Sequence, residues 1–357
     1  MRWAILFIFV ACAAFTHRRG KVRHGFFRQL SDHSTFTAPL NCFAYAFSNV
    51  PNTPYIDDAH FPELAILKRE WRTFRDEALA LRDASRIKAS GEYNDIGFNS
   101  FFRKGWKRFY LKWYDRPHPS ALAHCPRSLA ILSKLPSVKA AMFAQLPPGG
   151  KLGLHRDPYA GSLRYHLGLS TPNDDECAIV VDGDPYAWRD GEAVMFDETY
   201  LHWAENRTGH DRIILFCDIE RPMKYRWAQA VNGAIGGVLM RAAASPNETG
   251  DRTGGLNRLF RYLYAVRRVG KRLKAWNRTR LLRAQVGAVR RDSHRDSVAL
   301  SDRSRTSPSG PSSEWAHGAS APFAGVPPVS RFERARGGAG SEALPTGGGA
   351  VRFVAGR

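Results

Sequence analysis

Three residues have the types and the spacing of a metal site. His155 and Asp157 are separated by one residue, so both side chains would project to the same side of an extended strand. An isolated HxD triplet is weak evidence, because such triplets arise freely by chance. His202 follows 47 residues later and strengthens it. Two imidazoles and a carboxylate form the facial triad of non-haem Fe(II) oxygenases, which leaves positions open for a cosubstrate and for oxygen.

An arginine that follows these three residues in the sequence could bind an anion. Arg212 begins the strand-like segment RIILFCDI, ten residues after His202. A buried strand carries a cation at a cost unless an anion meets it. The planar guanidinium would pair in a bidentate way with the distal carboxylate of a dicarboxylate cosubstrate. The alternative is a surface ion pair with Asp211 or Glu220.

Two further polar residues share one face of a predicted strand. In residues 163–170, LRYHLGLS, apolar and other residues alternate, which predicts a half-buried strand. The period of two places Arg164 and His166 on the same side, where they would contact the same cosubstrate. For His166 alone, a place in the core is the more common outcome. Its pairing with Arg164 favours the binding role.

The elements that must position these residues are short strands. Between residues 138 and 221, apolar runs alternate with turn segments rich in Gly, Pro, Asn and Asp, which predicts a β-sandwich or barrel. Residues 62–92 have apolar side chains every three or four positions and predict a packed helix. Residues 101–114 interleave five Lys or Arg with seven aromatics. Such a segment could stack on bases, hold phosphates or cover the core with snorkelling side chains.

The N-terminus is predicted to meet a membrane. Residues 3–15 form an uninterrupted apolar run, which is shorter than the ~20 residues that span a bilayer comfortably. A cleaved signal peptide is therefore a competing interpretation. Only Arg2 precedes the run, whereas five basic residues follow it within 18–28. This asymmetry favours an uncleaved anchor with the rest of the chain in the cytoplasm.

Two other segments could also lie against lipid. Residues 35–54 mix aromatics with Pro and Asn, which suits either an interfacial surface or the domain core. Residues 256–291 contain 12 Lys or Arg, no Asp or Glu, and one apolar stripe. They predict a basic amphipathic helix on a membrane, with a nucleic-acid arm as the alternative. Residues 292–357 are rich in Ser, Gly, Pro, Ala and Arg without periodicity, and predict a disordered tail.

The bulk composition narrows the class of protein. The chain is 43% hydrophobic, which excludes a wholly disordered protein. Its net charge of +20 predicts attraction to polyanions, such as anionic lipid or nucleic acid, without choosing among them. The five cysteines are scattered, with no CxxC pair or zinc-like spacing. They are interpreted as ordinary thiols in a reducing compartment.

Longer motifs extend the comparison to a known family. The segments HRDPYAGSLRYHLGL and DETYLHWAENRTGHDRIILFCDI resemble the aspartyl/asparaginyl β-hydroxylase superfamily. GFNSFFRKGWKRFYLKWYD, QLPPGGKLGLHRDP and the N-terminal region are more similar to its lipid A acyl-chain 2-hydroxylases. The resemblance runs from the N-terminus to roughly residue 280. It implies a mainly β fold, a double-stranded β-helix of the jelly-roll or cupin-like type with flanking helices.

The resemblance also implies a role for each motif residue. His155 and His202 match iron-binding histidines, and the cofactors would be Fe(II) and 2-oxoglutarate, with O2 consumed. The 2-oxoglutarate contacts of the family match Arg164, His166 and Arg212. At Asp157 the protein-modifying relatives carry glycine. Here Asp157 completes the triad of metal ligands and separates this chain from that branch.

The sequence therefore predicts a membrane-anchored dioxygenase with five regions. They are an anchor (1–17), a basic interfacial segment (18–60), a catalytic domain (61–240, β core 138–221), a basic amphipathic segment (241–291) and a disordered tail (292–357).

Its substrate would be lipid A, an anionic glycolipid, hydroxylated at C2 of a secondary acyl chain. The expected site of action is the cytoplasmic face of the inner membrane, with membrane lipid but no nucleic acid as partner. Hydroxylation of an Asp or Asn side chain in a protein is the second hypothesis. A metal-free barrel that binds anionic lipid or nucleic acid is the third.

Overall fold

The computed structural model describes residues 1–88, 95, 101, 105–260 and 262. The chain divides into two compact units, Met1–Arg283 and Ala284–Arg357. The second unit lies wholly outside the described residues. So do the predicted tail at 292–357 and most of the predicted amphipathic segment at 241–291.

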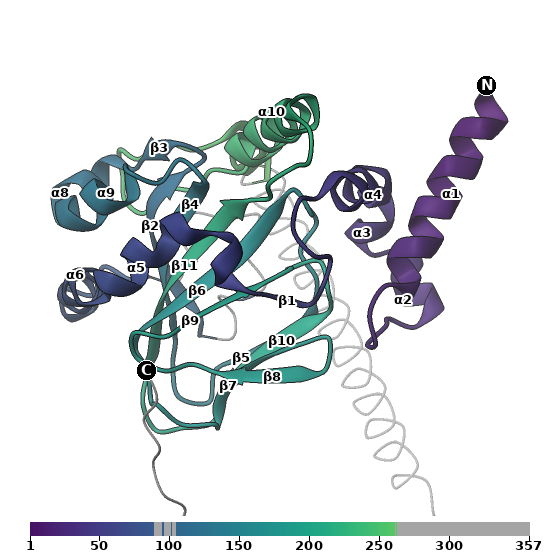
Figure 1. Cartoon of the computed structure of the whole chain (residues 1–357). Helices are drawn as coiled ribbons and strands as arrows, with labels where there is room; N and C mark the ends of the chain where they lie inside the picture. Colours follow the sequence, from purple (N-terminus) through teal and green to yellow (C-terminus); the bar gives the residue numbers. More distant parts are fainter. Residues whose placement is uncertain (89–94, 96–100, 102–104, 261, 263–357) are drawn as a thin grey trace, which may run out of the picture. The chain divides into compact units, whose positions relative to one another are not determined.

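Two antiparallel sheets form the core of the first unit (Figure 1). In the described chain, the larger sheet has the strand order β1-β9-β6-β11-β4-β2-β3 and the smaller one β5-β10-β7-β8. The prediction of a mainly β fold is confirmed. The strands of the larger sheet are β1 (Tyr55–Ile56), β2 (Lys107–Trp113), β3 (Arg116–Pro117), β4 (Val138–Leu146), β6 (Ser162–Ser170), β9 (Ala193–Phe196) and β11 (Arg212–Glu220). Those of the smaller sheet are β5 (Lys151–His155), β7 (Cys177–Val181), β8 (Asp184–Ala187) and β10 (His202–Asn206).

Strand β6 shows how the alternating pattern sets the layers. Its leucines and Tyr165 point into the main hydrophobic cluster, beneath the outer helices. Arg164 and His166 point the other way and line a cavity with residues of the smaller sheet. The strand predicted at 163–170 is confirmed, including its two faces. One face of β6 therefore packs in the core, and the other face supplies polar residues to the cavity.

The larger sheet recruits strands from outside the range 138–221. Strand β2 pairs with β4 along most of its length, and β1 pairs with β9. Residues 107–113 of the basic aromatic segment are therefore a largely buried strand. Arg108 is buried, where its guanidinium donates to Asp95 at 2.9 and 3.1 Å. For this stretch, the structure favours covering the core over facing a ligand.

Helices cover the outer face of the larger sheet. They comprise α5 (Ala65–Arg69), α6 (Trp71–Asp83), α8 (Pro119–His124) and α9 (Pro126–Leu132), preceded by short 3-10 turns at Asp58–His60 and Pro62–Leu64. Helix α6 packs on β6 through a stripe that includes Phe74, Ala78 and Leu81, all buried. The helix predicted at 62–92 thus forms in two pieces that end at Asp83, and the described residues 84–88 beyond it are not helical. Flanking helices were part of the predicted fold and are confirmed.

The N-terminal helices and the last long helix flank one edge of the core (Figure 1). They are α1 (Arg2–Arg18), α2 (Phe26–Leu30), α3 (His33–Phe36), α4 (Ala38–Phe47) and α10 (Arg226–Ala242). Helix α1 packs on α3 and α4. In the part of the chain that is described, no helix combines the length and the apolar character needed to cross a membrane.

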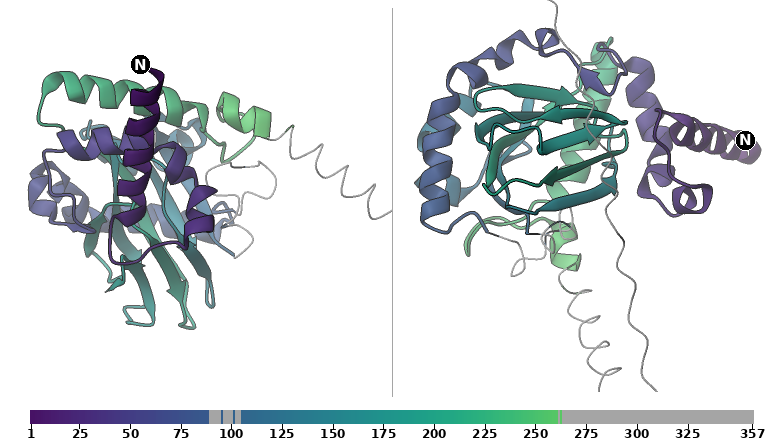
Figure 2. Two further views of the ribbon diagram at one scale, coloured as in Figure 1. Left: turned by 90° about the vertical axis from the view of Figure 1, so that its right-hand side faces the viewer. Right: turned by 90° about the horizontal axis from the view of Figure 1, so that it is seen from below.

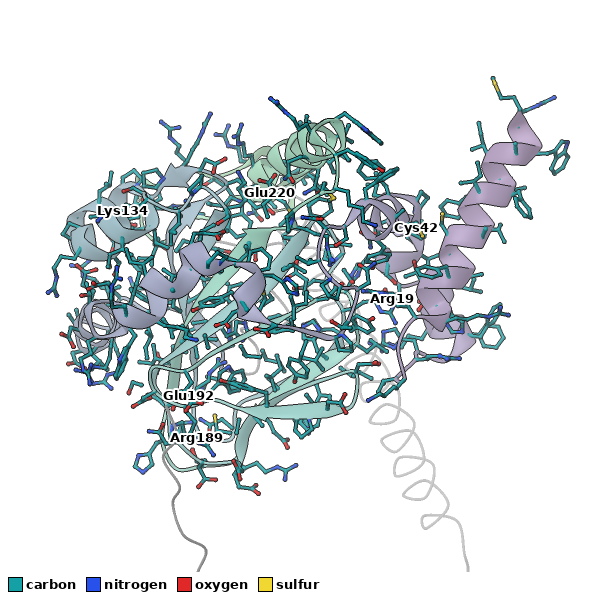
Figure 3. The ribbon with its side chains drawn as sticks, viewed as in Figure 1. Arg19, Cys42, Lys134, Arg189, Glu192 and Glu220 are labelled. Atoms are coloured by element: carbon teal, nitrogen blue, oxygen red, sulfur yellow. The ribbon has the colours of Figure 1, made fainter. Side chains whose placement is uncertain are left out.

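A buried charge network fastens α1 to the sheets. Arg19 at the end of α1 and Arg221 at the end of β11 both donate to Asp197 Oδ2 at 2.6 Å. Arg19 lies between α1 and the two sheets in Figure 3. Burial would raise the pKa of Asp197, but the two guanidinium groups hold that pKa well below its usual range. Asp197 is therefore ionised, and each arginine has a partner away from water.

Replacing this aspartate tests the network. In Asp197→Ala, both arginines lose their buried partner, which typically costs about 3–5 kcal/mol. We expect urea denaturation to show a free energy of unfolding lower by about that amount. The control is Asp184→Ala, which removes only an exposed pair with Lys21 and should leave stability essentially unchanged. Equal stability of the two variants would contradict the role of Asp197.

Candidate metal centre

Two histidines meet because of how two short strands pair. Strands β5 and β10 are antiparallel neighbours, and His155 lies directly opposite His202. Their ring centroids are 4.2 Å apart. The register of this pair shifts between His202 and Ala204, as at a β-bulge. Bulges are frequent next to active sites, where they re-aim side chains.

Backbone carbonyls orient both imidazoles. His155 Nδ1 lies 2.7 Å from the Gly153 carbonyl oxygen, and His202 Nδ1 lies 3.0 Å from that of Tyr200. A carbonyl can only accept, so these bonds place the proton on Nδ1 and leave Nε2 free to bind a metal. Burial lowers the pKa of His155, and it lowers the pKa of His202 to about 3. Both rings are therefore neutral near pH 7, as metal ligands must be.

Asp157 completes the set. One ligand atom each from His155, Asp157 and His202 lie within 4.8 Å of one another. The Asp157 Oδ1 atom is 3.9 Å from His155 Nε2. Burial would raise the pKa of Asp157, but the charge of Arg164, together with smaller effects of His202 and His155, outweighs burial and holds that pKa at about 2. Two neutral imidazoles and one carboxylate suit the facial coordination of Fe(II).

Arg164 is surrounded by carboxylates. Its guanidinium donates to Asp157 Oδ2 at 2.6 Å and to Asp218 Oδ1 at 2.5 Å. It also forms an ion pair with Glu198, whose backbone carbonyl accepts from the Asp157 backbone N–H at 2.8 Å. Burial raises the pKa of Glu198 well above its usual range, and it raises the pKa of Asp218. In this structure Arg164 therefore orients Asp157 by direct contact.

Arg212 presents the opposite case. It is 2% exposed, and its Nε and one terminal nitrogen have no hydrogen-bond partner among the residues that the structure describes. Its guanidinium stacks over the ring of Trp188, 4.3 Å from the centroid. Burial lowers the pKa of Arg212 to about 10, so it keeps its charge at neutral pH. An unpaired buried cation is costly, and a bound anion would supply its missing partner.

The neighbouring polar groups are unpartnered as well. Both ring nitrogens of His166 and the indole N–H of Trp188 are buried and have no hydrogen-bond partner in the described ranges of the chain. Burial lowers the pKa of His166 well below its usual range, so the ring is neutral. A carboxylate could accept from these groups as well as from Arg212. The residues therefore fit a dicarboxylate cosubstrate beside the metal ligands.

All six residues singled out from the sequence border one cavity: His155, Asp157, Arg164, His166, His202 and Arg212. The cavity measures about 40 Å³, which is room for a few water molecules. A five-carbon dicarboxylate would therefore need lining side chains to turn aside. Phe101, whose ring centroid is 4.8 Å from that of His155, also lines it.

Sequence reasoning missed three residues of this site. Asp218 had a usable signal, because it lies on the same face of its strand as Arg212, at a spacing of six residues. It is the direct cross-strand partner of Arg164. Glu198 and Trp188 lie outside regular strands and carried no periodic signal.

Known proteins resemble the chain over this region. Residues 68–222 match the model of the aspartyl/asparaginyl β-hydroxylase family. The ornithine lipid ester-linked acyl 2-hydroxylase of Rhizobium tropici is 34% identical over 192 residues, 53% of this chain and 68% of that protein. The human aspartyl/asparaginyl β-hydroxylase is 28% identical over 161 residues, 44% of this chain but 21% of that protein. A solved Pseudomonas putida prolyl-4-hydroxylase is 16% identical with a TM-score of 0.28, covering 43% of this chain and 88% of that one.

The contacts of Arg164 predict an effect on the metal. In Arg164→Met, Asp157 loses the cation that holds it, and we expect Co(II) to bind the protein without cosubstrate about 10- to 100-fold more weakly. Arg164→Lys should recover part of the affinity. Arg212→Met is the matched control and should leave Co(II) affinity within about two-fold, because within the described chain Arg212 forms no hydrogen bond or ion pair with the three ligands. Unchanged Co(II) affinity in Arg164→Met, with weakened 2-oxoglutarate binding, would instead support the cosubstrate contact expected from the sequence.

The isolation of Arg212 predicts opposite effects on binding and stability. In Arg212→Met, affinity for 2-oxoglutarate, measured by calorimetry with Mn(II) present, should fall roughly 100-fold or more. Charge-assisted hydrogen bonds are worth about 1.5–3 kcal/mol each. Without 2-oxoglutarate, the variant should be no less stable to urea, because an unpaired buried charge has been removed. A clear loss of stability would show that Arg212 has a structural partner instead.

Proposed function

The chain belongs to the aspartyl/asparaginyl β-hydroxylase family and is a hydroxylase, and we propose that it uses Fe(II) and 2-oxoglutarate to hydroxylate an acyl chain of a membrane lipid. His155, Asp157 and His202 would hold the iron. Arg212 and His166 would hold the 2-oxoglutarate carboxylates. Lipid A, modified at C2 of a secondary acyl chain, is the proposed substrate.

One observation carries the cofactor assignment. Arg212, a buried cation with two guanidinium nitrogens that have no hydrogen-bond partner among the described residues, lines the same cavity as two neutral imidazoles and an ionised carboxylate. A bound anion would stabilise the buried cation, and two imidazoles with a carboxylate would bind a divalent metal. 2-Oxoglutarate supplies a carboxylate for Arg212 and a keto acid end that can chelate the metal. A structural ion pair would not leave the guanidinium nitrogens unpaired.

The bound groups and the protein divide the chemistry. When bound, Fe(II) and 2-oxoglutarate would supply the activation of O2, with succinate, carbon dioxide and a hydroxylated carbon as the overall products. The protein orients the imidazoles through the carbonyls of Gly153 and Tyr200, and it holds Asp157 through Arg164. Apolar side chains such as Ile214 and Phe216 line the cavity and exclude water. Exclusion of water protects the reaction from side products.

The name of the bacterial relative supports a lipid substrate. That protein is an acyl 2-hydroxylase of ornithine lipid, and this chain covers 68% of its length. Ester-linked acyl chains of ornithine lipid and secondary acyl chains of lipid A present a similar C2 position. Ornithine lipid is therefore the nearest competing substrate within the same reaction. The net charge of +20 suits the phosphates of lipid A.

The proposed location is the cytoplasmic face of the inner membrane. An apolar run at residues 3–15 followed by five basic residues supports this orientation. The proposed anchor is single and N-terminal. It would keep the catalytic domain close to the lipid that carries the target chain.

A protein substrate is the second candidate. It is supported by the human aspartyl/asparaginyl β-hydroxylase, of which the chain covers 21%. The third metal ligand argues against it, since protein-modifying relatives are expected to carry glycine at the position of Asp157. Hydroxylated Asp or Asn in peptides, with all lipids unchanged, would favour this candidate.

Mass spectrometry of lipids tests the proposal. Cells that carry the intact protein should contain lipid A with one added oxygen on a secondary acyl chain, and cells that carry His155→Ala should not, because the metal loses a ligand. His210→Ala is the matched control, since His210 is exposed and outside the cavity, and it should retain the product. Ornithine lipid from the same cells is measured in parallel.

The outcomes separate the candidates. An added oxygen on ornithine lipid alone would keep the reaction and change the substrate. Unmodified lipids in all strains, with the protein expressed, would overturn the lipid assignment. A purified protein that binds no Fe(II) but binds polyanions in a salt-sensitive way would support the metal-free barrel.

A further inference from the structure

Two segments about 200 residues apart in the sequence form one apolar surface. Aromatic side chains of α4 contact those at the start of α10: the ring centroids of Phe47 and Trp227 are 4.8 Å apart, and those of Phe43 and Trp227 are 6.0 Å apart. Helix α4 in turn packs on α1. In Figure 2 (left), α10 and the N-terminal end of α1 lie along the same upper edge of the unit. We call the exposed side of α1, α2 and α10 the docking face.

Helix α10 is apolar on its outer side as well as its inner side. Ala228, Asn232 and Gly236 face the core and are buried. Trp227 and Val238 face outward and are 55% and 77% exposed, with Val231 between them also exposed. These three recur at helical spacing and form one stripe. A water-facing helix side would instead carry charged residues.

The N-terminal helices continue the exposed apolar area. On α1, most large apolar residues are exposed, with Trp3 at 81%. On α2, Phe27 is 85% exposed and Phe26 stands beside it in edge contact. Single exposed apolar residues are ordinary, but the number of large exposed apolar side chains on α1, α2 and α10 indicates an interaction surface. We therefore expect a binding partner to cover this apolar area.

The charges around the docking face indicate the chemistry of the partner that covers it. Residues 1–31 and 221–247, which supply the face, contain no Asp or Glu. Lys224 and Arg226 are exposed at the start of α10, and the described chain shows no ion pair for either. Arg23 and Arg28 are exposed beside α2. An apolar stripe bordered only by cations matches an anionic lipid leaflet.

The far end of α10 adds a cationic pocket. A cavity of about 560 Å³ opens beside Arg241, and its lining includes Asp251 as well as Arg116, Arg252 and Arg258. These last three have no ion pair with an acidic residue within the described part of the chain. A phosphate group could pair with guanidinium groups that converge in this way. The stripe of α10 thus runs between cations at its start and cations at its end.

We propose that the docking face binds an anionic phospholipid leaflet, with α10 lying in the plane of the headgroups. Trp227, Val231 and Val238 enter the apolar layer, and the flanking cations meet lipid phosphates. Helix α10 follows β11, which carries Arg212, after a short connection, so lipid contact by α10 places the catalytic unit against the leaflet. The proposal rests on the exposure and the charge of these residues, and it does not depend on which lipid is hydroxylated.

Depth measurement with nitroxide labels tests the position of α10. The full chain, with Cys12 and Cys42 replaced by alanine, receives one new cysteine: Val231→Cys, Val238→Cys or Leu122→Cys. Leu122 is an exposed apolar residue of α8 and is the matched control. On vesicles of phosphatidylcholine with phosphatidylglycerol, electron paramagnetic resonance should place the labels at 231 and 238 below the phosphates and the label at 122 in water.

A charge comparison tests the second half of the proposal. Partitioning should be stronger on vesicles with phosphatidylglycerol than on pure phosphatidylcholine, and salt should weaken it. Lys224→Gln and Arg226→Gln should each weaken it roughly five-fold. Inorganic phosphate at millimolar concentration should not displace the protein, because the apolar stripe also contributes. Displacement by free phosphate would overturn the leaflet as occupant.

The remaining outcomes are distinguishable. Labels at 231 and 238 that stay in water on vesicle-bound protein would overturn the placement of α10. A stable dimer without vesicles that shields both labels would show that a second copy covers the face. Iron and 2-oxoglutarate are absent from these measurements, so failure of the lipid hydroxylation assay would leave this result intact, and the reverse also holds.

Discussion

The pairing of β10 with β5 is the constraint on which the site depends. It sets His202 opposite His155, and the chain leaving β5 then carries Asp157 to the same place. Side chains alternate between the faces of a strand, so a slip of one residue would turn an imidazole away from the cavity. The short turn-rich connections around these strands, together with the bulge after His202, hold this register. The metal site is in this sense a property of the smaller sheet.

The larger sheet contributes charge, and it does so in three different ways. Arg221 is fully paired with Asp197 and serves structure. Arg164 is surrounded by three carboxylates and orients one of them toward the metal. Arg212 is buried, and two of its guanidinium nitrogens have no hydrogen-bond partner within the described part of the chain, which suits a ligand. Three arginines with similar burial thus have separate roles, because the pairing of each guanidinium, and not its depth, determines what it can bind.

Catalytic chemistry and lipid contact are joined through the same strand. Strand β11 begins at Arg212 in the cavity and ends at Glu220, beside the Arg221–Asp197 pair that also fastens Arg19 of α1. Helix α10 follows a few residues later. A lipid surface bound by α1 and α10 would therefore be rigidly connected to the cavity. Such a connection would let an enzyme act on an acyl chain held in a leaflet without a mobile linker.

The sequence by itself determined the ligand types and the faces of the strands. Alternation in residues 163–170 was sufficient to place Arg164 and His166 on one side, because a period of two is a local property. It did not determine that Arg164 meets Asp218 and Glu198, or that Arg212 pairs with no acidic residue of the described chain. Nor did it show that β2 joins the larger sheet, or that α10 adjoins α4. Those facts depend on register and packing between segments far apart in the chain, which only the tertiary structure decides.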